Sequence, residues 1–182
     1  MSAQAAFRTK VLFDTNQLLQ KAKSEEEIFS LTASQLMKLL NRSLIVYLEQ
    51  NGGLGAEQVF GVDGETAQNI FSAPEERDAA NWTFANKKRS GAGTDSYPDA
   101  KGLYLALRTG GGVFGVIGID LSEKPLDAFE NSVLLSILGE GALAIENRRN
   151  ALEKEQATVQ AKNEELRANL LRTCLLYTSD AA

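Results

Sequence analysis

The sequence contains no histidine, and its single cysteine, Cys174, lies in the last nine of its 182 residues. Histidine and cysteine are the usual ligands of zinc, haem iron and iron–sulfur clusters, and they also supply most activated nucleophiles. Their scarcity excludes most sites of these kinds. Asp and Glu could supply oxygen ligands to a cation, but no loop has EF-hand spacing. We therefore predict no catalytic residue, no metal and no cofactor in this chain.

Clusters of basic residues are missing as well. The chain has 19 Lys and Arg against 24 Asp and Glu, and its net charge of −5 is spread along the sequence. Nucleic-acid and membrane surfaces both require clustered positive charge, so neither is expected. The longest candidate apolar run, residues 113–121, is far shorter than the roughly 20 residues of a membrane span, and the N-terminus is unlike a signal peptide. These features predict a soluble, cytoplasmic protein.

The C-terminal stretch CLLYTSDAA, residues 174–182, resembles a transposase sequencing adapter translated in frame. We interpret these residues as non-biological, the alternative being a natural terminus that matches an adapter by chance. Residues 1–173 are then the protein, and we expect the natural chain to continue past Thr173.

Hydrophobic periodicity predicts helices followed by a sheet. A first helix carries Phe7, Val11, Leu18 and Ala22 on one stripe, and a second begins at a capping box of Ser24 and Glu27. Stretches rich in β-branched and aromatic residues predict strands near residues 43–50, 57–62, 102–109 and 113–121. The last of these is apolar on both faces and is therefore predicted to be central.

Two further helices are predicted in the second half of the chain. Pro74 suits the first turn of one that runs to about Arg89, and the other starts near Leu126. At about 1.5 Å per residue the last helix would be roughly 70 Å long, about twice the width of such a domain. We therefore expect it to extend beyond the domain. The predicted parts are a linker helix (1–23), a domain (24–141), a signalling helix (142–173) and the tail (174–182).

An apolar residue recurs every seven positions along the last helix. Three consecutive a positions of this heptad are polar, at Arg149, Gln156 and Asn163. A sustained period of 3.5 predicts a left-handed coiled coil, most simply a parallel homodimer of marginal stability. A plain spacer or dimerisation stalk is the alternative to a helix that transmits a signal. The predicted seam consists of Leu138, Ile145, Leu152, Val159 and Leu166.

The most distinctive segment is residues 82–98, which joins the end of a predicted helix to a glycine-rich loop. Free backbone N–H groups in such a loop can bind an anion or close over a small ligand. The structural alternative places Trp82 in the core, Asn86 as a cap of its own helix and Asp95 in an Asx turn. The predicted ligand-binding residues are Trp82, Asn86, Gly91, Gly93, Thr94 and Asp95.

The same segment resembles the GAF-like domain of the KdpD family of potassium-responsive sensor histidine kinases. The Trp82-x-x-x-Asn86 pair and the run from Gly91 to Pro98 are similar to the family signature W-x-x-x-N…G-x-G-T-D-T-x-P, with Ser96 in place of the second Thr. Residues 7–29 resemble the family's linker after its membrane helices, and residues 163–173 resemble the run before its phosphoacceptor motif. The resemblance covers nearly all of residues 7–173.

The resemblance implies an α+β, GAF-like fold in which helices flank a central, mainly antiparallel sheet of five or six strands, followed by a long C-terminal coiled-coil helix. Residues 24–141 would be the sensory domain, on the cytoplasmic face of an inner-membrane protein whose upstream helices lie outside this sequence. The helix would lead to a dimerisation and autokinase core that uses ATP to phosphorylate a histidine and passes the phosphoryl group to a response regulator of potassium uptake.

Neither the phosphoacceptor histidine nor the ATP site has a counterpart in this sequence, so no catalytic role is carried over. A GAF-like enzyme such as the free methionine sulfoxide reductases needs reactive cysteines, which residues 1–173 lack. A stand-alone small-molecule-binding module and a structural dimerisation domain remain open alternatives.

Overall fold

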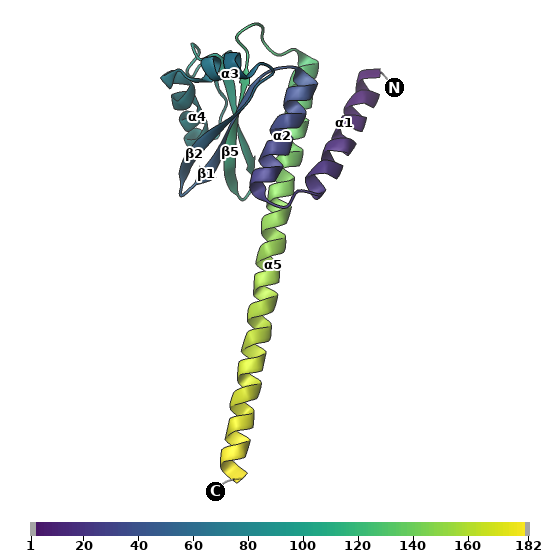
Figure 1. Ribbon diagram of the computed structural model, residues 1–182, viewed down its shortest axis with the longest axis vertical. Helices are drawn as coiled ribbons and strands as arrows, with labels where there is room; N and C mark the ends of the chain where they lie inside the picture. Colours follow the sequence, from purple (N-terminus) through teal and green to yellow (C-terminus); the bar gives the residue numbers. More distant parts are fainter. Residues whose placement is uncertain (1–2, 181–182) are drawn as a thin grey trace. The chain divides into compact units, whose positions relative to one another are not determined.

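The computed structural model describes residues 3–180, with side chains described as far as residue 176. The chain forms two compact units, residues 1–146 and residues 147–182. The second unit consists of the later part of the last helix. The elements are α1 (Ala3–Gln20), α2 (Glu25–Leu40), β1 (Leu44–Gln50), β2 (Gly53–Phe60), α3 (Gly64–Phe71), α4 (Pro74–Asn86), β3 (Ser90–Gly91), β4 (Gly102–Thr109), β5 (Gly112–Asp120) and α5 (Ala128–Asp180) (Figure 1).

The first unit is built on a five-stranded sheet with the order β2-β1-β5-β4-β3. Each pair of neighbouring strands is antiparallel. The predicted mainly antiparallel sheet is confirmed, and β5 is its central strand, as its two apolar faces predicted. Asn51 and Gly52 have positive φ values of 52° and 83°, so the reversal between β1 and β2 is tight.

Helices cover both faces of the sheet. α2 and the start of α5 lie on one face with α1 outside them, whereas α3 and α4 lie on the other (Figure 1). Successive residues of β1 alternate between the two cores, because side chains along a strand point to opposite faces. Leu44 and Val46 join the core under α2 and α5, and Ile45 and Tyr47 join the core under α3 and α4. The predicted α+β arrangement is confirmed.

The start of α2 follows the predicted capping box. The Ser24 hydroxyl accepts a hydrogen bond of 3.1 Å from the Glu27 amide, and the Glu27 carboxylate accepts one of 2.8 Å from the Lys23 amide. The first bond satisfies an amide of the first turn that the helix itself leaves without an acceptor, and the second ties the residue before the N-cap to the same turn.

Arg42, directly after α2, is a buried clamp on the start of α5. Its guanidinium forms an ion pair of 3.0 Å with Glu130 and donates to the carbonyls of Asp120, Lys124 and Pro125. One side chain therefore joins the end of α2, the end of β5 and the first turn of α5.

Three local predictions need correction. The stripe of α1 that packs on the domain is Val11, Thr15 and Leu19, while Phe7 and Leu18 are exposed. Because residues four apart stack on one helix face, the buried stripe starts at Val11 and continues to Leu19 rather than Leu18. The short helix α3 was not predicted. The glycine-rich loop predicted after the helix contains the two-residue strand β3, Ser90–Gly91.

Among the described residues, α5 is the one helix that is long and apolar enough to cross a membrane by length and composition alone, with a mean hydropathy of 1.3 in its most apolar window. A helix that packs in a protein core meets the same criterion. Of that window, 39% is buried inside the protein.

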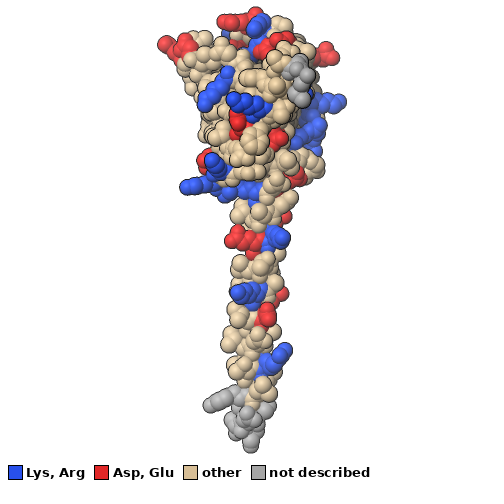
Figure 2. Space-filling view, turned by 90° about the vertical axis from the view of Figure 1, so that its right-hand side faces the viewer, with Lys and Arg blue, Asp and Glu red and all other residues tan. Residues whose placement is uncertain are grey.

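On the face of the molecule seen in Figure 2, basic side chains lie among acidic ones.

Two glycines near the start of α5 differ in their surroundings. A Cβ atom built on Gly139 would meet nothing within 4 Å, whereas one on Gly141 would lie 2.7 Å from the Thr32 hydroxyl of α2. Thr32 is fully buried and donates to the carbonyl of Ile28. Gly141 therefore permits the close approach of α2 and α5, and Gly139 has no such role within the described chain.

Alanine at these two glycines is expected to shift stability in opposite directions. Gly139→Ala should raise the free energy of unfolding by about 1 kcal/mol, because alanine has the higher helix propensity and finds open space. Gly141→Ala should lower it by roughly 1–3 kcal/mol, because the added methyl overpacks the contact with Thr32. Urea unfolding of both variants measures the difference, and a gain of stability in Gly141→Ala would contradict the packing described here.

Candidate functional site

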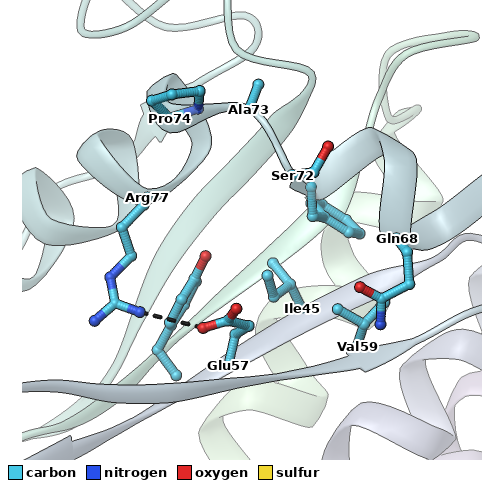
Figure 3. Close-up of a pocket in the computed structure, with 10 residues that line it drawn as sticks. Ile45, Glu57, Val59, Gln68, Ser72, Ala73, Pro74 and Arg77 are labelled. Atoms are coloured by element: carbon cyan, nitrogen blue, oxygen red, sulfur yellow. Dashed lines mark hydrogen bonds and ion pairs between the residues drawn. The ribbon is translucent and has the colours of Figure 1, made fainter.

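A pocket of about 400 Å³ opens between the sheet and the junction of α3 with α4 (Figure 3). Two strands form its floor, and the end of α3 and the start of α4 form its wall. This is the volume range of pockets for small ligands. The lining residues are Ile45, Tyr47, Glu57, Val59, Gln68, Phe71, Ser72, Ala73, Pro74 and Arg77.

Arg77 on α4 is the cationic group of this pocket. Its guanidinium lies 4.9 Å from the ring centroid of Tyr47, a cation–π distance, and donates a hydrogen bond of 2.9 Å to the carbonyl of Leu54. It also approaches Glu57 at 3.4 Å, with exposed fractions of 40% for Arg77 and 55% for Glu57. An ion pair this exposed is weak, because water screens both charges.

Tyr47 presents its hydroxyl to the pocket. The residue is only 2% exposed, and within the described chain its hydroxyl forms no hydrogen bond. No fully buried side-chain nitrogen or oxygen of the described residues lacks a partner, so this hydroxyl must reach the open space of the pocket. Burial raises the pKa of Tyr47 to about 12, against a smaller lowering by Arg77. The phenol therefore stays protonated at neutral pH and is available as a donor.

The start of α4 forms the edge of the pocket. Pro74 occupies the first turn, as predicted, and Ala73 before it is the N-cap. Ala73 has no side-chain oxygen, so no side chain caps α4, in contrast to Ser24 at α2. The amide of Glu76 bonds to the carbonyl of Ala73.

Glu76, next to Arg77, is a buried carboxylate that joins α4 to β4. It is 1% exposed and accepts hydrogen bonds from the amides of Lys101 at 2.5 Å and Gly102 at 3.2 Å, and from the Tyr104 hydroxyl at 2.5 Å. Burial, followed by this hydrogen bond, raises the pKa of Tyr104 far above its usual range. Two adjacent residues of α4 thus have different roles: Glu76 fixes the helix to β4, and Arg77 is the cationic group of the pocket.

The predicted Trp82 and Asn86 lie on the last turns of α4. The Asn86 amide donates a hydrogen bond of 2.9 Å to the carbonyl of Trp82, so it caps its own helix. Trp82 is half-buried and Asn86 is exposed. The structural alternative to ligand binding had predicted that Asn86 caps its own helix, and this hydrogen bond agrees with it.

The predicted glycine loop closes largely on itself. The Thr94 hydroxyl donates 2.8 Å hydrogen bonds to the carbonyls of Gly91 and Ser96, and the Gly91 amide donates to the Ser96 carbonyl. Gly91 has φ +93°, and a Cβ atom there would lie 2.0 Å from the Gly102 carbonyl, so glycine is required. Gly93 and Asp95 are exposed. Ligand binding by the six predicted residues stays a prediction, and none of them lines either pocket described in residues 3–176.

A second pocket, of about 590 Å³, lies beside Arg42. Several polar groups along it already have partners within the protein. Ser43 accepts from the Val62 amide, Asp120 accepts from the Ser122 amide, and Arg42 forms the bonds described above. It is therefore a weaker candidate than the pocket at Arg77.

The predicted coiled-coil seam must be shortened. Leu138 is 6% exposed and Ile145 is 0% exposed, because both pack in the domain core. A heptad repeat of apolar residues also arises when one face of a helix packs on a sheet. Because the core already buries Leu138 and Ile145, their side chains are not available to a coiled-coil partner. Leu152, Val159 and Leu166 in the second unit are exposed. A coiled coil through these three residues stays a prediction.

Sequence reasoning missed the residues that matter most at the pocket. Glu76 and Arg77 were assigned only to the predicted helix that starts at Pro74. Both Glu75 and Glu76 lie in its first turn, and residue type alone does not separate the buried Glu76 from the exposed Glu75. Tyr47 was placed correctly on a strand. The alternation along that strand groups Tyr47 with Ile45 on one face, which was the available signal.

Comparisons with known proteins agree with this architecture. No family model matches the sequence. A sensor protein KdpD of Clostridium acetobutylicum is 32% identical over 167 residues, which cover 91% of this chain and 19% of that protein. The chain thus spans about a fifth of the length of this curated relative.

Solved GAF domains have the same fold. The GAF domain of the potassium sensor histidine kinase KdpD from Escherichia coli matches with a TM-score of 0.55 and 18% identity, over 83% of this chain and 99% of that one. A GAF domain from Pseudomonas syringae pv. tomato matches with a TM-score of 0.56 and 19% identity, over 85% and 94% of the two chains. The fold of the chain is therefore GAF-like.

Removing the charge of Glu76 is expected to destabilise the domain. Glu76→Gln should lower the free energy of unfolding by about 3 kcal/mol, because an amide NH₂ would face hydrogen-bond donors in a buried site. The matched control Glu75→Gln, at an exposed position, should change it by less than about 0.5 kcal/mol. Chemical denaturation of both variants measures the effect, and equal stabilities would show that the buried carboxylate contributes nothing.

Proposed function

Because this chain is a KdpD-like GAF segment, we propose that it is the cytoplasmic regulatory part of a two-component sensor histidine kinase that controls potassium uptake. The observation that carries the proposal is the 32% identity with a KdpD sensor protein along 91% of the chain. The segment spans 19% of that relative, so the autokinase activity, its ATP and the response regulator are assigned to other parts of the parent protein.

The segment would act through α5. Leu134, Ile137 and Ile145 of this helix are fully buried in the domain core, and the helix continues without a break to Asp180. A change in the packing of the sheet face would therefore act directly on the helix that leads onward. This is the basis for proposing a conformational rather than a chemical output.

The onward helix would pair with the helix of a second copy through Leu152, Val159 and Leu166. Exposed apolar residues at a spacing of seven favour such a parallel pair. The polar a positions Gln156 and Asn163 weaken it. Two arrangements of a weakly held pair can differ by only a few kcal/mol, which suits a switch.

The pocket at Arg77 favours a second candidate function, a small-molecule-binding module. The two functions are compatible, because a ligand between the sheet and α4 would be a natural input to the regulatory segment. A purely structural dimerisation domain is the remaining alternative, and it requires neither the pocket nor a change in the helix.

Insertions in α5 of the full-length kinase that contains this segment test the signalling role. Four residues inserted after Glu155 should change autophosphorylation severalfold, because they rotate the seam away from its heptad phase. Seven residues inserted at the same point restore the phase and should leave autophosphorylation near its original level. The readout is phosphorylation by labelled ATP, and identical behaviour of both insertions and the parent would rule out transmission through the helix.

A charge in the seam is expected to prevent pairing of the chain. Val159→Asp should weaken self-association at least about tenfold, because a carboxylate would face its own copy in a desolvated layer. Ala157→Asp, two residues away and off the seam, is the matched control. Sedimentation under reducing conditions measures both, and a parent chain that remains monomeric at high concentration would refute the coiled coil.

A further inference from the structure

The reversal between β1 and β2 consists of Asn51 and Gly52, and Gln50 pairs with Gly53 across it (Figure 1). The main-chain nitrogen that follows an asparagine can attack the carbon of the side-chain amide, which closes a succinimide ring and releases ammonia. Glycine in the second position hinders this attack least, because it has no Cβ. No other asparagine of the sequence precedes a glycine.

Neither residue of this reversal is held by packing. Asn51 and Gly52 are both exposed, and a Cβ atom built on Gly52 would meet nothing within 4 Å. Among the described residues, no hydrogen bond holds the side-chain amide of Asn51. The side chain is therefore able to turn toward the nitrogen of Gly52.

Glu49 places a proton acceptor at that nitrogen. The Gly52 amide donates a hydrogen bond of 2.8 Å to Oε1 of Glu49, which is within the reach of a general base. The N–H bond lies in the plane of the peptide group, whereas the nitrogen attacks with the electrons above or below that plane. The carboxylate can thus take the proton without standing between the nitrogen and the carbon that it attacks.

Asn41 is a natural comparison within the same chain. It is exposed and has φ 52°, the value that Asn51 also has. The next residue is Arg42, whose side chain is held by several hydrogen bonds, and within the described chain no carboxylate accepts from its amide. The two asparagines therefore differ in the residue that follows them and in the presence of a base.

We propose that Asn51 is a site of self-modification, in which Glu49 is the base for attack by the Gly52 nitrogen on the Asn51 side chain. A bond forms between this nitrogen and Cγ while the proton of the nitrogen moves to the carboxylate. The proton then passes to the leaving amino group, which departs as ammonia and leaves Glu49 ionised again. Water opens the succinimide at either carbonyl and gives aspartate or isoaspartate.

The modification would loosen this end of the hairpin. Either product adds a negative charge beside Glu49. Isoaspartate also brings its Cβ into the main chain, so the reversal gains an atom and the pairing of Gln50 with Gly53 is disturbed. The next residue is Leu54, whose carbonyl accepts from Arg77, so the change would reach the floor of the pocket.

Peptide mass spectrometry of the full chain, after incubation at neutral pH and physiological temperature, tests the site. Asn51 should convert to aspartate and isoaspartate at least about tenfold faster than Asn41 or Asn69. Asn69 is an exposed residue of α3 that precedes Ile70 and lies in the same tryptic peptide as Asn51. Conversion of Asn51 at the rate of the other two would overturn the proposal.

Two variants test the role of the base. Glu49→Gln should slow conversion of Asn51 severalfold, because the amide still accepts the Gly52 N–H but does not remove its proton. Glu65→Gln, which removes the same charge from an exposed position on α3, should leave the rate unchanged. Unfolding of a variant would release every asparagine together, so each rate is compared with that of Asn41 in the same molecule. An unchanged or faster rate in Glu49→Gln would refute the proposal.

This inference does not depend on the regulatory function, since the isolated chain is sufficient for the test. The variant Asn51→Asp carries the charge of the product without the additional main-chain atom, and it should unfold at nearly the same urea concentration as the parent. The isoaspartate fraction of the aged chain, separated by chromatography, should unfold at a lower urea concentration. Equal midpoints for that fraction and the parent would contradict the loosening of the hairpin.

Discussion

The need to cover both faces of the sheet is the constraint on which this structure depends. β5 is apolar on both sides and central, so helices must pack above and below it. α2 and the start of α5 cover one face, which commits α5 to the core as far as Ile145. α3 and α4 cover the other, and the space they leave beside β1 and β2 is the pocket. The helix that would carry a signal and the pocket that would receive one therefore lie on opposite faces of the same strands.

The adjacent residues Glu76 and Arg77 connect α4 both to β4 and to the strands beneath the pocket. The buried carboxylate of Glu76 ties the helix to the start of β4, and Arg77 reaches across the pocket to Tyr47 and β2. A change in what Arg77 binds would thus act on a helix that is already bonded to the sheet. Because β4 pairs with β5, and β5 packs under α5, contacts run without interruption from the pocket to the output helix.

Patterns that depend on neighbours in sequence predicted much of the fold. The Ser24 cap, Pro74 in a first turn and the central position of β5 each follow from a few adjacent residues, and the structure confirms them. The pocket was not predictable in this way. It requires Arg77, Tyr47 and Glu57 to meet from three elements, and no periodicity records such a meeting. The heptad pattern also placed Leu138 and Ile145 in the coiled-coil seam, although both pack in the domain core. A helix that packs on a sheet and a helix that packs on another helix both carry a single apolar stripe, so the pattern does not distinguish the two cases.

The Arg42 clamp has a mechanical consequence. It holds the first turn of α5 through Glu130, the end of β5 through the Asp120 carbonyl, and the loop between them through the carbonyls of Lys124 and Pro125. Any shift of the end of α2 or of the end of β5 would therefore pull on Glu130 and on the loop before α5, so the same side chain that holds these elements together would also carry a displacement of the sheet into the first turn of α5.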